Sequence, residues 1–119
     1  MSDYPGTFDS ELELRASASQ SIGSANGTGI AAGPTGQMPV KLVVIVSSVG
    51  TSGTLDVHLE SSGDNAVADA YADIAHSAMT QITAAGRYEQ LVWLPEKWVR
   101  AVGTAGTDAV TWQAFITRA

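Results

Sequence analysis

The stretch from Pro39 to Ser62 limits the fold of this chain more than any other part of the sequence. If its first half is extended, one face carries Val40, Leu42, Val44 and Val46. Val43 and Ile45 then fall on the opposite face, so both faces are apolar. Apolar side chains on both faces are typical of a strand that is covered on both sides. We therefore expect a central strand of a sheet here.

The second half of this stretch has a different pattern. Leu55, Val57 and Leu59 alternate with polar residues, which predicts a strand with one buried and one solvated face. Gly50 and Gly53 place a turn between the two strands. We expect the two strands to form a long hairpin. Since an isolated hairpin is not stable in water, the rest of the chain must add strands and a second layer.

Composition sets the size and the class of the fold. The chain has 119 residues, of which 45% are hydrophobic and 15% are charged, and this suits one domain with a genuine core. It contains no cysteine, so we expect neither a disulfide framework nor a thiolate metal site. The apolar core must therefore provide the stability.

The charge of the chain argues against two classes of partner. Lys and Arg number 6 against 12 Asp and Glu, and the net charge of −6 opposes binding to a phosphate backbone or an anionic membrane. Apolar runs fall short of the roughly 20 residues that span a bilayer. The N-terminus is acidic where a signal peptide would be basic. We expect no nucleic acid partner, no membrane association and no secretion.

We divide the chain into an extended N-terminal arm, residues 1–14, and a single β-sandwich domain, residues 15–119. The arm is acidic and has no Lys or Arg, but it also holds Tyr4, Phe8 and Leu12. It is either a frayed terminus whose last residues begin a strand or an arm that docks on a neighbouring subunit through its aromatic residues.

Two further segments have less regular patterns. Residues 23–36, which include Ile30, consist mostly of turn formers, so we expect a surface loop that orders on contact. In residues 64–82, apolar side chains recur at helical spacing and the alanine content favours a helix. The end of the same segment, residues 74–82, also fits two short strands with a kink. Helical and extended structures both remain open on this pattern.

The last third of the sequence returns to strand patterns. Residues 88–94 place Leu91 and Trp93 on one face and Val92 on the other, and residues 97–102 and 110–116 alternate again. The motif VGTAGT at 102–107 repeats VGTSGT at 49–54, so we expect a second hairpin. Two hairpins predict two antiparallel sheets whose inner faces meet. The expected fold class is an all-β antiparallel sandwich.

Few residues in this sequence are suited to catalysis. Enzymes most often use His as a base, and the chain has two, His58 and His76. His58 lies on the wet face of its strand, two residues from Asp56 and two from Glu60. A carboxylate could orient the ring or the three side chains could bind a cation, but a solvated face is the favoured interpretation. We expect no enzyme activity, no cofactor and no metal.

The three tryptophans keep a second function open. Trp93, Trp98 and Trp112 could stack against sugar rings, although each lies in an apolar alternation that favours a core or interface position. The alternative function is therefore a β-sandwich carbohydrate-binding module that uses exposed aromatic side chains.

Several segments resemble the small jelly-roll capsid cement, or decoration, proteins of tailed bacteriophages. These segments span nearly the whole chain and are RASASQSIGS, PVKLVVIVSSVGTSGTLDVHLESSGDN, YADIAHS and LPEKWVRAVGTAGTDAVTWQAFIT. The most specific are LESSGDN with the Tyr71, Asp73 and Ile74 step downstream, and LPEKWVRAV with the Gly-Thr turn and final strand after it. The resemblance implies a jelly-roll sandwich in which the region around Tyr71 is extended rather than helical.

The resemblance also implies a function. Proteins of this family bind as homotrimers to the outer surface of an icosahedral head and clamp subunits of the major capsid protein. Such a chain would be made in the cytoplasm of a bacterial host and would act in the virion, without an active site. A trimer requires a head-to-tail interface that closes after three copies. Candidate contacts with the capsid or with a neighbouring subunit are Tyr4, Phe8, Leu12 and Ile30.

Overall fold

The structure, a computed structural model, describes residues 12–32 and 38–118, and these residues form nine strands and no α-helix. The strands are, in chain order, β1 (Glu13–Gln20), β2 (Gly23–Asn26), β3 (Ile30–Ala31), β4 (Met38–Val49), β5 (Thr54–Ser62), β6 (Ala72–Asp73), β7 (Gly86–Leu94), β8 (Trp98–Gly106) and β9 (Val110–Arg118). Within these ranges, no helix is long and apolar enough to cross a membrane.

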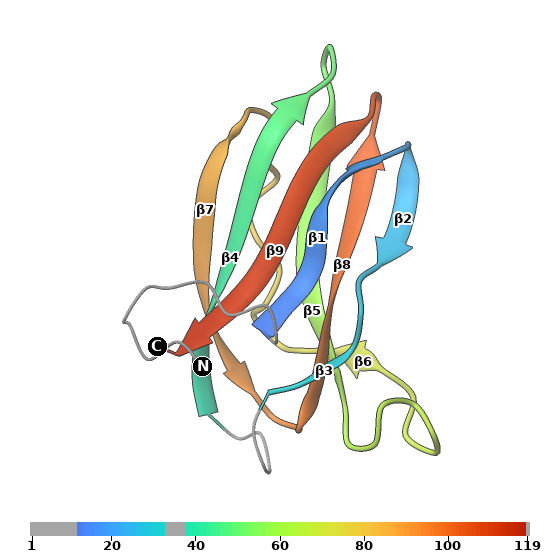
Figure 1. Cartoon of the computed structure of the whole chain (residues 1–119), viewed down its shortest axis with the longest axis vertical. Coiled ribbons are helices and arrows are strands. Elements are labelled where there is room, and N and C mark those ends of the chain that lie inside the picture. Colours follow the sequence, from blue (N-terminus) through green and yellow to red (C-terminus); the bar gives the residue numbers. More distant parts are fainter. Residues whose placement is uncertain (1–11, 33–37, 119) are drawn as a thin grey trace.

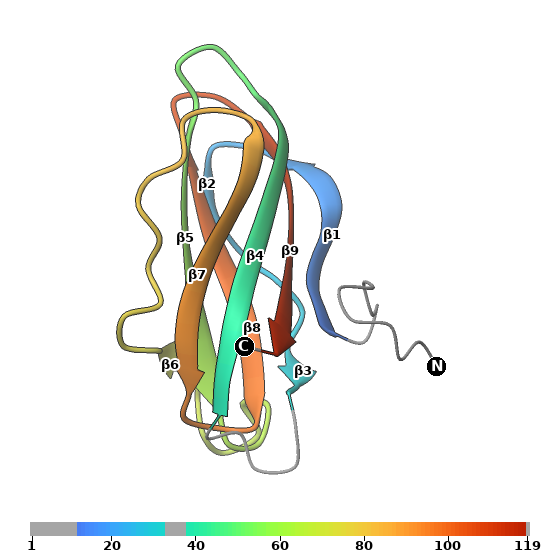
Figure 2. The same cartoon turned by 90° about the vertical axis from the view of Figure 1, so that its left-hand side faces the viewer.

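The strands form two antiparallel sheets that face each other (Figures 1 and 2). The first sheet has the order β1-β9-β4-β7, and the second has the order β2-β8-β5-β6 with β3 also paired to β8. Strands that are neighbours in a sheet are mostly distant in the chain, as in the double-sheet jelly roll. The expected all-β antiparallel sandwich is therefore confirmed.

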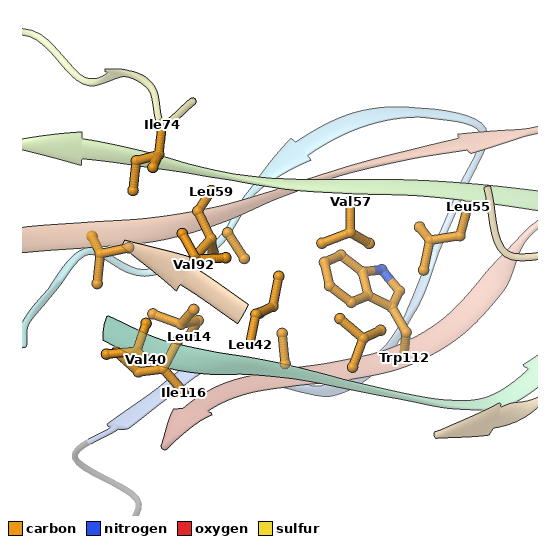
Figure 3. Packing of buried hydrophobic residues seen from close by; sticks show 14 of the residues in the cluster. Leu14, Val40, Leu42, Leu55, Val57, Leu59, Ile74, Val92, Trp112 and Ile116 are labelled. Carbon is orange, nitrogen blue, oxygen red and sulfur yellow. The ribbon is translucent and has the colours of Figure 1, made fainter. Parts of the chain in front are cut away.

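The core lies between the sheets and follows from the alternation in the strands. The expected central strand is confirmed as β4, which pairs with β7 on one side and with β9 on the other. Its inward-facing side chains are Val40, Leu42, Val44 and Val46. Figure 3 shows Trp112 of β9 in contact with this core opposite Val57 of β5. Full burial of one large aliphatic side chain stabilises a fold by about 1.5–3 kcal/mol, so this layer dominates the stability.

Both expected hairpins are wrong. β4 and β5 follow each other in the chain but lie in different sheets, and the same holds for β8 and β9. Their connections therefore cross from one sheet to the other. Alternation shows which face of a strand is buried, but it does not show whether the next strand pairs beside it or packs opposite it.

The two VGT motifs do not occupy equivalent places. Residues 50–53 connect β4 to β5, whereas Val102–Gly106 of the second motif lies within β8 and pairs with β2 and β5. The chain turns only after it, at Thr107, which has a positive φ of 68°. The two motifs thus have similar sequences but different structures.

The boundaries of the expected arm and loop are also corrected. β1 begins at Glu13 and Leu14 is fully buried, so the last two residues of the expected arm belong to the sandwich. Residues 23–26 and 30–31 are the strands β2 and β3, where we expected a loop, because the edge of β8 supplies pairing partners. Residues 1–11 and 33–37 lie outside the described part of the chain.

Residues 64–82 are extended or in turns, as the resemblance implies, and the helical alternative is wrong. Ile74 and Ile82 are buried beside β5 of the second sheet. Backbone N–H groups of Ile74, Met79 and Ile82 donate to carbonyls of β5 at 2.9 Å each. The segment therefore runs along β5 and covers its outer edge. Of the residues at helical spacing, Ile74 is buried but Val67, Ala70 and Ala78 are exposed, so that spacing does not mark a buried face.

Candidate contact surface

Exposed apolar side chains indicate where this protein can bind a partner. Four large apolar residues in the described part of the chain are exposed: Ile22, Val67, Leu91 and Trp93. Ile22 and Val67 lie singly in connections, whereas Leu91 and Trp93 are two residues apart on the same strand, β7. Single exposed apolar residues are ordinary, but adjacent ones mark interaction sites.

The alternation of β7 explains why these two side chains point outward. Val92 and Leu94 are buried in the core, so Leu91 and Trp93 face away from the second sheet. They are 67% and 58% exposed. β7 is the edge strand of the first sheet, and Pro39 of β4 pairs directly with Trp93. We call Pro39, Leu91 and Trp93 the β7 patch.

Charged side chains border this patch on the same face. Lys41 pairs with Leu91 in register, and its Nζ lies 3.3 Å from Glu89. Arg87 Nε donates to Glu89 at 2.8 Å. The Arg87 and Lys41 hydrogen bonds hold the pKa of Glu89 below its usual range. Because these groups are exposed, they add little stability but give the apolar patch a polar rim.

The outer face of the first sheet also carries apolar side chains on its two inner strands, β4 and β9. Val43 points away from the inter-sheet core and is nevertheless fully buried, and Phe115, its partner in β9, is almost fully buried. The Arg87 guanidinium lies 6.0 Å from the centre of the Phe115 ring. In the register of the sheet, Lys41 and Glu89 lie between this buried pair and the β7 patch.

Of the four contact residues expected from the sequence, the structure describes two, Leu12 and Ile30. Leu12 and Ile30 are half-buried and pack against the core, so they offer less free surface than the β7 patch. Tyr4 and Phe8 lie outside the described residues. We did not select Leu91 and Trp93 as contacts, although the alternation placed them together on one face. The sequence did not show that Val92 and Leu94 form the buried face of the strand, and this burial is what exposes Leu91 and Trp93.

The polar residues around His58 differ from the expected set. His58 lies near Glu60, as its place on the strand indicated, but its second neighbour is Asp73 of β6. Asp56 instead accepts a hydrogen bond from Gln81 at 3.0 Å. His76 is exposed in the segment before β7.

The fold is a jelly-roll-like antiparallel β-sandwich, and one of its sheets carries the exposed β7 patch. Comparison of the sequence with models of protein families finds no match, and comparison with curated proteins finds none either. Function must therefore be argued from the residues of this chain.

Proposed function

We propose that this chain is a structural virion protein, a capsid cement or decoration protein that binds the outside of an icosahedral phage head as a homotrimer. The observation that supports the proposal most is the β7 patch, where Trp93 and Leu91 are exposed on a regular sheet. Trp is among the residues that most often dominate binding energy at protein interfaces. The sequence resemblance supplies the class of partner, the major capsid protein.

A rigid sheet is well suited to this task. Side chains on a paired strand lose little conformational freedom when they bind, so more of the contact energy is available for affinity. The charged rim of Lys41, Arg87 and Glu89 gives the patch orientation. Tyr4 and Phe8, which lie outside the described ranges, remain candidate contacts on the basis of the sequence alone.

Clamping a shell requires no active site. A protein that binds only the assembled, expanded shell stabilises it by mass action, by about 4 kcal/mol per site at a free concentration a thousandfold above the dissociation constant. A trimer makes three such contacts at once, and the first contact raises the effective concentration of the other two. Individually modest patches then give slow release.

Co-sedimentation with phage heads tests the proposal. The untagged chain is mixed with expanded and with unexpanded heads of the phage that encodes it, and its mass in free solution is measured in parallel. We expect a trimer that pellets with expanded heads only. A monomer that pellets with neither kind of head would refute the proposal.

A carbohydrate-binding module is the second candidate, and the exposure of Trp93 is the observation that favours it. A sugar ring stacks on an accessible aromatic face, and Trp93 offers one. Trp112 is buried and Trp98 is half-buried, so the described residues provide no platform of several tryptophans. Titration of the chain with glycans, followed by Trp fluorescence, separates the two functions, since cement binding predicts no change.

A further inference from the structure

Four charged or ionisable side chains meet on the outer face of the second sheet, opposite the side that packs in the core. His58 and Glu60 project from β5, where Val57 and Leu59 point into the core. Asp73 of β6 pairs with Glu60 in register, and Arg100 of β8 pairs with Glu60 from the other side. β5 and β6 thus bring one imidazole and two carboxylates to the same place, and β8 adds a guanidinium (Figure 2 shows β6 beside β5).

The imidazole of His58 faces both carboxylates. Its Nε2 lies 3.1 Å from Asp73 Oδ1 and 3.6 Å from Glu60 Oε2. One donor atom from each of the three residues lies within 4.8 Å of the other two. The Nε2 atom is shielded from solvent and makes no hydrogen bond. A shielded nitrogen with a free position beside two anionic oxygens is a favourable place for a cation.

We propose that His58, Glu60 and Asp73 bind a divalent transition-metal cation, of which Zn²⁺ is the best fit. Zn²⁺ binds nitrogen and carboxylate oxygen at about 2.0–2.2 Å, so adjacent ligand atoms are about 3–3.5 Å apart. The two distances from Nε2 are already close to this spacing. The two carboxylate oxygens lie within 4.8 Å of each other, and the Asp73 side chain, which is 76% exposed, has room to move closer to Glu60.

Neighbouring side chains orient one of the ligands. Arg100 binds Glu60 Oε1 through Nη2 at 2.7 Å and Nε at 2.8 Å, which leaves Oε2 to face His58. The guanidinium lies over the Tyr71 ring at 4.3 Å, and the Tyr71 hydroxyl donates to Asn65 at 2.7 Å. Such outer partners fix the orientation of metal ligands.

The donor set also determines which cations bind. Ca²⁺ takes six to eight oxygen ligands and Mg²⁺ prefers an octahedron of oxygens, whereas this cluster offers two carboxylates and one imidazole. The positive charge of Arg100 opposes all divalent cations alike, so the selectivity comes from the imidazole nitrogen. The bound cation would join β5 to β6, a strand of only two residues, and would raise the thermal stability as its concentration increases.

Calorimetric titration of the untagged full chain with ZnCl₂ tests the site, with Co²⁺ absorption as a second probe. We expect one Zn²⁺ per chain and no competition from MgCl₂. His58→Gln and Asp73→Asn should each weaken Zn²⁺ binding by about tenfold or more, since each removes a ligand atom. Circular dichroism before each titration confirms that a variant is folded.

Two matched controls come from the same chain. Asp56→Asn changes a carboxylate on the same face of β5, and His76→Gln changes the other histidine. Both should bind Zn²⁺ as the wild type does. Absence of Zn²⁺ binding to the wild type, or equal binding by the folded His58→Gln and Asp73→Asn variants, would overturn the proposal. Either result leaves the cement function untouched, because that function does not depend on the cation.

Discussion

Gly103 of β8 and Trp112 of β9 pack against each other across the two sheets, with no room for a β-carbon at position 103. The indole N–H of Trp112 donates to Gln20 Oε1 at 2.9 Å. Gln20 Nε2 in turn donates to the carbonyls of Gly103 and Gly23, each at 2.8 Å. A glycine, a buried amide and a buried indole thus form one unit that joins β1, β8 and β9.

Gly103→Ala should destabilise the fold, because the new methyl group would overlap the Trp112 ring. Overpacking of a dense core costs about 1–3 kcal/mol. Denaturant unfolding measures the change in the free energy of unfolding. Gly63→Ala is the control, since a β-carbon there meets only carboxylate oxygens of Glu96 and Asp69, at 3.2 and 3.3 Å. Equal effects of the two substitutions would show that packing against Trp112 is not the cause.

Gln20→Ala should also destabilise the fold, for a different reason. The substitution leaves the buried Trp112 indole N–H without its partner, and an unpaired buried donor costs about 1–3 kcal/mol. Thermal or denaturant unfolding gives the measurement. Gln81→Ala removes an exposed amide that bonds only Asp56 and should change the free energy of unfolding by less than about 0.5 kcal/mol. Similar losses from both variants would contradict the account.

The fold class could be predicted from the sequence, but the strand pairing could not. Alternation located β4, β5, β7, β8 and β9 because each has a buried face, and it is a local property. Pairing in a jelly roll joins strands far apart in the chain, for example Glu13 of β1 with Phe115 of β9. Nothing local specifies such partners, so we assigned neighbours in sequence to hairpins.

The contact surface could be predicted only in part, as Trp93 and Trp112 illustrate. The residues on either side of Trp112, Thr111 and Gln113, are polar, so the sequence shows that the face with Trp112 is the buried one. Around Trp93, Leu91 and Val92 make both faces apolar, so the sequence does not show which one meets the core. The sequence placed His58 beside Glu60 and Asp56 and favoured a solvated face without a metal, whereas the second neighbour in the structure, Asp73, comes from a strand that only the folded chain brings near.

Asp64 gives the fold a dependence on pH. The backbone N–H of Asp69, followed by that of Ala68, lowers the pKa of Asp64 below its ordinary value of 3.8. A carboxylate with a lowered pKa in the folded state adds stability above the unfolded pKa, and this is lost as the pH falls through the folded pKa. Asp64→Asn should therefore be less stable than the wild type at neutral pH.

The difference between these two proteins should shrink in acid, below the ordinary pKa of 3.8. Urea unfolding of both proteins at neutral pH and at about pH 2.5 measures it. Because Asp64 is exposed, the effect is small, and the comparison relies on its sign. A difference of the same size at both pH values would show that the carboxylate charge is not involved.

Binding of β7-patch variants to expanded heads tests the central claim most directly. The combined substitutions Leu91→Ser and Trp93→Ser remove the exposed apolar pair without touching the core, so the chain should remain folded by circular dichroism. Co-sedimentation with expanded heads should be weakened about tenfold or more, since loss of an interface Trp commonly costs at least that. Val67→Ser, which removes a single exposed apolar side chain elsewhere, should bind as the wild type does. A folded Leu91→Ser, Trp93→Ser variant that binds expanded heads with wild-type affinity would contradict the claim.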